Sequence, residues 1–198
     1  MHTSEKIFNP DLAQRLEDPE RKTWMPPDEI IAPLRLQPGM HVADVGAGTG
    51  YFSLPLSVAV GPEGHVYAID PVVEMRAILA GKLTASDAPQ NISVQEGLAE
   101  QLPLDDDSCD AVFLANVWHG VEDREAALRE CERVLRVPGH VLILDWHHDR
   151  ERPPGPPLER RIPATQVVTF FQQHGWMVTE QRDIGPNHYL LLARPTQS

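Results

Sequence analysis

The chain has 198 residues, of which 41% are hydrophobic, and its formal net charge at pH 7 is -12. This size suits one globular domain with its own core, and the acidic charge argues against partners such as nucleic acids and anionic membranes, whose binding generally needs a basic surface. A small-molecule or protein substrate is therefore expected, and since no apolar run resembles a signal peptide or a membrane span, a cytoplasmic location is expected too.

The first part of the chain, residues 1–36, is expected to form a helical cap before a single globular unit at 37–198. Residues 9–20 resemble a short polar helix, and the prolines and acids at 26–29 are typical of a second helix start. Trp24 lies between these helices. Two interpretations stay open for this segment: it packs on the sheet edge, or it forms a lid with Trp24 facing the substrate.

The centre of the sequence is a strand, residues 41–45, that runs into a turn with glycines on alternate positions, Gly46, Gly48 and Gly50. Glycines let the backbone bend sharply and approach a ligand closely, and the amides at the following helix start favour a carboxylate or phosphate. The turn lacks the Lys of a Walker loop, and its third glycine comes one position earlier than in the dinucleotide fingerprint. With Asp44 before the first glycine, it favours a ligand that carries an ammonium group.

Asp70 follows the second expected strand, residues 65–69, and lies 24 residues after Gly46. This separation suits one β-α-β unit. A carboxylate at the end of the second strand can accept hydrogen bonds from both hydroxyls of a ribose. We therefore expect Asp70 to bind the ribose of a nucleoside.

The fourth expected strand, residues 109–115, leads to Asn116 and His119. Ligands bind beyond the carboxyl ends of parallel strands where the strand order reverses, so both side chains are expected to face the ligand. Adjacent His147 and His148 follow the fifth strand, but neighbouring strand side chains point to opposite faces, so no metal site is expected there.

The other expected elements complete an alternating pattern of helices and strands. Residues 153–157 form a proline-rich loop, either a rim on the substrate side or a plain connector. The remaining elements are helices at 72–85, 123–136 and 164–174, strands at 91–95 and 141–144, a turn at 137–139, and a final hairpin of strands at 176–183 and 188–193.

Asp44 and the three glycines match, position for position, an acidic residue followed by x-G-x-G-x-G. In this motif the chain resembles the class I S-adenosylmethionine-dependent methyltransferases, and in particular the small-molecule, type 11 enzymes. The resemblance implies an α/β fold: a Rossmann-like, seven-stranded, mostly parallel sheet with one antiparallel strand and helices on both faces.

The resemblance also implies S-adenosylmethionine as cofactor and S-adenosylhomocysteine as product. The glycine loop would hold the carboxylate end of the cofactor and Asp44 its ammonium group, with Asn116 nearby. Residues 97–104 resemble the family segment G-D-A-E-x-L-P, but Leu98 replaces the Asp that contacts adenine. We therefore expect backbone contacts to adenine at Leu98 or Ala99.

The implied reaction transfers the sulfonium methyl group to an acceptor, mainly by holding the two reactants in line. If the acceptor must lose a proton, His119 is the first candidate base, ahead of His147, Tyr189 and His188, although a structural role for His119 stays open. The sequence does not identify the acceptor. Arsenite methylation, however, uses several thiolates, and only Cys109 and Cys131 are present.

Two other functions stay open at this point. The chain could be a noncatalytic methyltransferase-like protein that binds the cofactor and serves a partner, or an NAD-binding oxidoreductase, which the glycine spacing disfavours. No oligomeric state is indicated.

Overall fold

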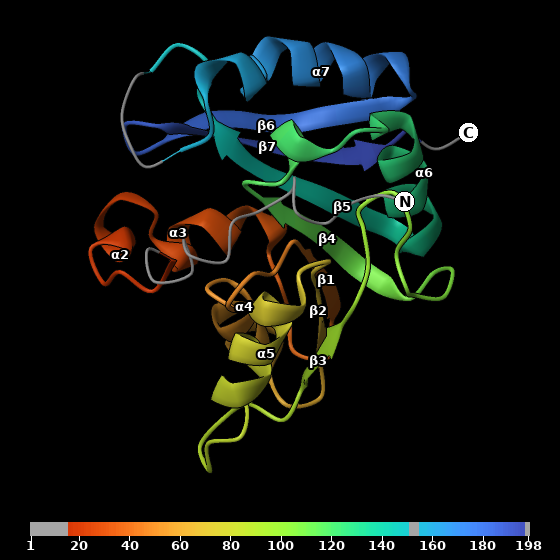
Figure 1. Cartoon of the computed structure of the whole chain (residues 1–198). Coiled ribbons are helices and arrows are strands. Elements are labelled where there is room, and N and C mark those ends of the chain that lie inside the picture. The colour runs from red at the N-terminus through yellow and green to blue at the C-terminus, as the bar shows by residue number, and fades with distance from the viewer. Residues whose placement is uncertain (1–15, 151–154, 197–198) are drawn as a thin grey trace.

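One seven-stranded sheet forms the centre of the computed structural model, which describes residues 16–150 and 155–196 (Figure 1). Its strand order is β3-β2-β1-β4-β5-β7-β6, and β7 pairs antiparallel with both of its neighbours, whereas the other pairs are parallel. The expected sheet with one antiparallel strand is therefore confirmed. The strands are β1 (His41–Val45), β2 (His65–Ile69), β3 (Ile92–Gln95), β4 (Cys109–Ala115), β5 (Leu135–Trp146), β6 (Trp176–Ile184) and β7 (His188–Pro195).

Helices cover both faces of the sheet, as expected. One hydrophobic cluster joins α3, α4 and the short η3 to one face, and a second joins α6 and α7 to the other. A small third cluster packs Leu79 of α5 against Ala68 of β2. The α-helices are α2 (Arg21–Trp24), α3 (Pro27–Ile31), α4 (Ser53–Val60), α5 (Val73–Lys82), α6 (Arg124–Val134) and α7 (Ala164–Gln173), and the 3-10 helices are η3 (Ala32–Leu34), η4 (Trp118–Gly120) and η5 (Leu158–Arg160).

The two central strands, β1 and β4, carry mostly apolar side chains because helices cover both faces of the sheet there. In β1, Val42 and Ala43 are fully buried on opposite faces, one in each large cluster, as is typical of parallel strands. From β1 the chain winds outward through β2 and β3 and then crosses back to β4 on the other side of β1. The loops after β1 and β4 consequently diverge, and a space opens between them at the carboxyl ends of these strands.

The sequence placed the start of β5 too late. The strand begins at Leu135, which pairs with Cys109, and a register shift separates this pair from the next one, Ala111 with His140. The expected turn at 137–139 therefore lies inside the strand. The pairing of β5 with β4 on both sides of this register shift depends on tertiary contacts, which the Pro-Gly sequence at 138–139 does not reveal.

The N-terminal segment packs on the sheet through Trp24, whose ring stacks on His188 at a centroid distance of 5.8 Å and lies 6.3 Å from Trp146. Met25 is fully buried and accepts a hydrogen bond from the Tyr51 hydroxyl on its carbonyl oxygen. Most of the expected helix at 9–20, and Pro153 and Pro154 of the expected loop, lie outside the described residues. In the described part, no helix has the length and apolar character needed to cross a bilayer.

The glycine loop generates a stability prediction, because Gly50 has φ +88° and an added Cβ would lie 2.4 Å from Leu79 Cδ1. Gly50→Ala should lower the free energy of unfolding by about 1–3 kcal/mol through backbone strain and overpacking, measured by urea denaturation. Gly81→Ala is the matched control, because Gly81 is helical and open to solvent, and it should be neutral or stabilising by up to about 1 kcal/mol. Equal stability of the Gly50→Ala variant and the unmodified protein would contradict the assignment of strain to this turn.

Candidate functional site

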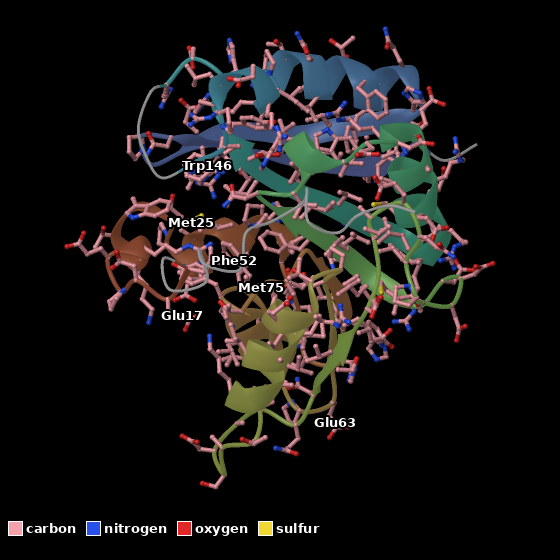
Figure 2. The ribbon with its side chains drawn as sticks, viewed as in Figure 1. Glu17, Met25, Phe52, Glu63, Met75 and Trp146 are labelled. Carbon is pink, nitrogen blue, oxygen red and sulfur yellow. The ribbon has the colours of Figure 1, made fainter. Side chains whose placement is uncertain are left out.

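A cavity of about 550 Å³ opens at the carboxyl ends of β1, β2 and β4. Its size lies within the range of small-molecule sites. Eight of the residues singled out in the sequence line it together: Asp44, Gly46, Gly48, Asp70, Leu98, Ala99, Asn116 and His119. Phe52 and Met75, whose side chains are labelled in Figure 2, line it as well.

The three glycines of the loop all have positive φ, but they serve different purposes. An added Cβ at Gly46 would lie 2.2 Å from Val117 Cγ2, so this glycine lets the loops after β1 and β4 touch. Gly48 lines the cavity, and the nearest atom to its added Cβ is 3.6 Å away. Gly50 is not among the lining residues and faces Leu79. The loop therefore presents Gly46 and Gly48 to the cavity and packs Gly50 against α5.

Asp44 is an acid at the base of the cavity with only 2% of its surface exposed. Its Oδ2 accepts a hydrogen bond of 2.6 Å from the Ser53 hydroxyl at the start of α4. The pKa of Asp44 is raised to about 7, mainly by burial and also by the nearby Asp70 carboxylate, while the Ser53 hydrogen bond opposes the shift. A buried carboxylate of this kind is stabilised by any cation that enters the cavity.

Asp70 joins the glycine loop to the loop after β2. Its two carboxylate oxygens accept backbone hydrogen bonds of 2.8 Å, one from the Gly48 N–H and one from the Val72 N–H. Burial raises the pKa of Asp70, and these two hydrogen bonds oppose that effect. Each carboxylate oxygen can accept more than one hydrogen bond, so Asp70 retains capacity for a ligand hydroxyl.

Asn116 begins the loop after β4 in a left-handed conformation, with φ +60°. Its backbone N–H extends the β4–β5 ladder by donating to the Leu144 carbonyl, and its side-chain amide nitrogen lies 3.8 Å from Met25 Sδ. The side-chain oxygen, Oδ1, is buried and has no hydrogen-bond partner among the described residues. An acceptor of this kind in a cavity wall fits a ligand that donates a hydrogen bond.

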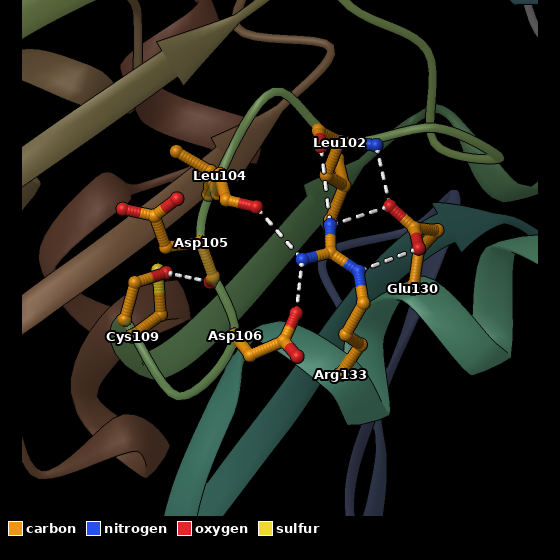
Figure 3. A network of polar contacts seen from close by, with 8 residues as sticks. Leu102, Leu104, Asp105, Asp106, Cys109, Glu130 and Arg133 are labelled. Atoms are coloured by element: carbon orange, nitrogen blue, oxygen red, sulfur yellow. Dashed lines mark hydrogen bonds and ion pairs between the residues drawn. The ribbon is translucent and has the colours of Figure 1, made fainter.

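Leu98 and Ala99 belong to the loop between β3 and β4. Figure 3 shows how Glu130 and Arg133 of α6 hold a later part of this loop, at Leu102 and Leu104. The Leu102 N–H donates to Glu130 Oε2, and the guanidinium of Arg133 donates to the carbonyls of Leu102 and Leu104. Arg133 also binds Glu130 and Asp106, and the hydrogen bond to Arg133 is the main cause of a lowered pKa of Glu130. Asp106, in the turn before β4, thus binds Arg133 while its own side chain stays 74% exposed.

His119 and Asp145 form a pair at the ends of neighbouring strands. The Nδ1 atom of His119 lies 2.8 Å from Asp145 Oδ1, and the His119 backbone N–H donates to Oδ2 of the same carboxylate, also at 2.8 Å. Asp145 is 1% exposed, whereas His119 lines the cavity. A carboxylate on Nδ1 favours the tautomer with the proton there, which leaves Nε2 as an acceptor. The pair can therefore act as a base toward a ligand.

The other three candidate bases lie elsewhere. His147 Nε2 is 3.1 Å from Asp183 Oδ1 at the β6–β7 hairpin, and His147 is not among the cavity residues. Tyr189 is 1% exposed within the core, and its hydroxyl has no hydrogen-bond partner among the described residues. His188 is fully buried, and burial lowers its pKa to about 3. His119 is therefore the candidate base that the structure places at the cavity. No group of three metal-binding side chains occurs among the described residues.

Several cavity residues did not stand out in the sequence. The N-terminal segment contributes Leu16 and Arg21, and the turn before α4 contributes Tyr51. Trp24, which the lid hypothesis placed at the substrate, is not among the lining residues. The only local sequence signal for Arg21 is its position three residues before Trp24, because side chains at this spacing are neighbours on a helix.

Comparisons with known proteins agree with this geometry. Residues 43–143, from β1 to β5, match the family model described as a methyltransferase domain. An uncharacterised methyltransferase of Mycobacterium tuberculosis is 37% identical over 160 residues, covering 75% of this chain and 61% of that protein. The ubiquinone/menaquinone biosynthesis C-methyltransferase UbiE of Ectopseudomonas mendocina is 30% identical over 148 residues, covering 75% of this chain and 56% of that protein. The chain thus spans less than two thirds of the length of these relatives.

The crystal structure of an S-adenosylmethionine-dependent methyltransferase from Aquifex aeolicus superposes with a TM-score of 0.87 at 30% identity. The match covers 94% of this chain and 98% of that one. The similarity therefore includes the cavity, the sheet and the surrounding helices.

The contact between His119 and Asp145 predicts a tautomer that NMR can measure. Neutral His119 should carry its proton on Nδ1, and Asp145→Asn should shift it toward Nε2 because the amide can donate to Nδ1. Long-range ¹H–¹⁵N correlation spectra distinguish the two forms, with His119→Gln to assign the signal. Circular dichroism should show that the Asp145→Asn variant stays folded. An unmodified protein with the proton of His119 on Nε2 would contradict this role of Asp145.

Proposed function

The chain belongs to the methyltransferase domain family, and from this premise we propose that it transfers the methyl group of S-adenosylmethionine to a small-molecule acceptor. One observation carries the proposal. The cavity at the carboxyl ends of β1, β2 and β4 contains two buried acids, Asp44 and Asp70, and the unpartnered Asn116 Oδ1. These groups suit a ligand that offers a cation and several hydrogen-bond donors.

The residues present fit the cofactor in separate parts of the cavity. Asp44 and Asn116 Oδ1 would hold its ammonium group, and Asp70 would accept the hydroxyls of its ribose while it keeps its bonds to Gly48 and Val72. Leu98 and Ala99 would contact adenine through their backbone. When bound, the cofactor supplies an electrophilic methyl group on a sulfonium.

The protein would contribute mainly by orientation. Holding an acceptor in line with the reacting methyl group can supply about 7–11 kcal/mol in favourable cases, and apolar walls such as Phe52 and Met75 exclude water. Where the acceptor carries a proton that must leave, His119 Nε2 would accept it, with Asp145 stabilising the resulting imidazolium.

The acceptor is proposed to be a small organic molecule. The net charge of -12 suits neither a nucleic acid nor an anionic surface. Burial raises the pKa of Cys109 to about 11 and that of Cys131 to about 12, so neither thiol suits the thiolate chemistry of arsenite methylation. UbiE, by its name, methylates carbon in quinone biosynthesis, which makes phenolic and quinol rings the first acceptors to screen.

Methyl transfer can be distinguished from the two alternatives by binding and turnover. Tight binding of S-adenosylmethionine without product over a broad acceptor screen would indicate a noncatalytic, cofactor-binding protein. Preferential binding of NADH would indicate an oxidoreductase, although the family to which the chain belongs disfavours that outcome.

The proposed ribose contact predicts the effect of removing Asp70. Asp70→Ala should weaken S-adenosylmethionine binding about 100-fold, because two charge-assisted hydrogen bonds are lost, as measured by isothermal titration calorimetry. Adenosine, which shares the ribose, should lose affinity in parallel. Asp87→Ala is the matched control at an exposed acid outside the cavity. Unchanged affinity in the Asp70→Ala variant would remove Asp70 from the ribose site.

The raised pKa of Asp44 predicts that cofactor binding releases a proton. With a pKa of about 7, Asp44 is partly protonated at neutral pH, and a bound ammonium group favours the carboxylate. Affinity should therefore fall as the pH decreases from 8 to 6, and calorimetry in buffers of different ionisation enthalpy should detect the released proton. Asp44→Asn should bind more weakly and without this proton release. Unchanged proton release in that variant would contradict the assignment.

The raised pKa of Asp44 also makes the folding stability depend on pH. The folded state keeps the Asp44 proton up to about pH 7, whereas an unfolded Asp loses it near pH 4. Between these values the folded state binds more protons, so the contribution of Asp44 to stability decreases as the pH rises. This sign is opposite to that of a carboxylate with a lowered pKa.

A further inference from the structure

The amides of the glycine loop are largely occupied by bonds within the protein. The Gly46 and Ala47 N–H groups both donate to the Ile69 carbonyl, at 2.7 and 3.0 Å. The Gly48 N–H donates to Asp70 Oδ2, and the Gly50 N–H donates to the Ala47 carbonyl. These four donors are not free for an anion. The loop was expected to hold the carboxylate of the ligand, and these four amides do not serve that contact, which leaves a role for a further donor in the cavity wall.

Arg21 offers such a donor. Among the described residues that line the cavity, it is the one lysine or arginine, and it is only 7% exposed. One hydrogen bond from its guanidinium is present, from Nη1 to the Leu16 carbonyl at 2.9 Å. No carboxylate of residues 16–150 or 155–196 lies within ion-pair distance of it. The guanidinium thus keeps most of its five N–H donors for other partners.

Among the described residues, the acid whose charge acts on Arg21 is already paired with other groups. Glu17 acts on Arg21 through space, but its own carboxylate binds the Thr49 hydroxyl and Lys82 Nζ. Burial lowers the pKa of Arg21 to about 10, so it stays cationic at neutral pH. A buried cation without a paired anion is unfavourable, and a ligand anion would relieve this cost.

The guanidinium is also held in a fixed orientation. Its Cζ lies 4.0 Å from the centre of the Tyr51 ring, and the Tyr51 hydroxyl donates to the Met25 carbonyl at 2.7 Å. Stacking on an aromatic ring that is itself anchored restrains the planar fork of Arg21. A fixed guanidinium fork matches the two oxygens of a carboxylate.

We propose that Arg21 is the carboxylate-binding residue of the cavity, an inference that rests on the proposed function. Two sources share this chemistry: the carboxylate in the amino-acid part of the cofactor, and a carboxylate on the acceptor. If the carboxylate belongs to the cofactor, Arg21 binds it and the glycine loop shapes the cavity. If it belongs to the acceptor, the acceptor is an organic acid.

Calorimetry with two cofactor forms separates these sources. S-adenosylmethionine and its decarboxylated analogue both carry the ammonium group and ribose, but only the first carries the carboxylate. If Arg21 binds the cofactor carboxylate, Arg21→Gln weakens S-adenosylmethionine binding about 10- to 100-fold and leaves the affinity of the analogue within about twofold. Retained binding of the analogue also shows that the variant is folded, and Arg21→Lys should lose less.

Lys22→Gln is the matched control, because Lys22 is the exposed neighbour of Arg21 on α2 and does not line the cavity. It should change neither affinity. Benzoate provides the second arm. If the acceptor supplies the carboxylate, benzoate binds the complex with S-adenosylhomocysteine in NMR titrations, and Arg21→Gln abolishes that binding while S-adenosylmethionine affinity is unchanged.

The outcomes keep the two proposals distinct. A protein that binds neither cofactor form contradicts the proposed function, yet Arg21-dependent binding of benzoate to the free protein would still support a carboxylate site. Equal affinities of Arg21→Gln and the unmodified protein for S-adenosylmethionine, together with benzoate binding that is absent or independent of Arg21, would overturn the assignment of Arg21.

Discussion

The candidate site depends on hydrogen bonds that continue the sheet beyond the ends of its strands. After β1, the Gly46 and Ala47 amides bind the last carbonyl of β2, and the Gly48 amide binds Asp70. After β4, the Asn116 amide binds the Leu144 carbonyl of β5. These contacts fix two loops that diverge because the strand order reverses between β1 and β4. The cavity is thus a consequence of topology, and hydrogen bonds within the protein hold its walls.

Electrostatics explains why that cavity suits a zwitterion. Asp44 and Asp70 are buried acids with raised pKa values, and Arg21 is a buried cation whose pKa is lowered. Burial is the largest cause of all three pKa shifts. No partner among the described residues therefore fully compensates the desolvation of these groups. A ligand with an ammonium group and a carboxylate supplies both missing charges.

The sequence predicted those features of the fold that arise from local patterns. The glycine loop, the strand that precedes it and Asp70 were located correctly because strand periodicity and glycine spacing are properties of short segments. The start of β5 was placed too late, since it depends on pairing with Cys109 in another strand. Arg21 was not identified because its importance comes from burial beside a loop that lies more than 20 residues further along the chain. Neither pairing nor burial of this kind can be read from a single segment.

The cavity joins two sets of elements that can vary independently. The proposed nucleoside contacts belong to the loops after β1, β2 and β3. Asp70 joins the first two of these loops, and Arg133 of α6 holds the third. His119 and Asp145 belong to the ends of β4 and β5 and share no hydrogen bond with Asp44 or Asp70 among the described residues. This separation explains in physical terms why the cofactor motif is readable from the sequence while the acceptor is not.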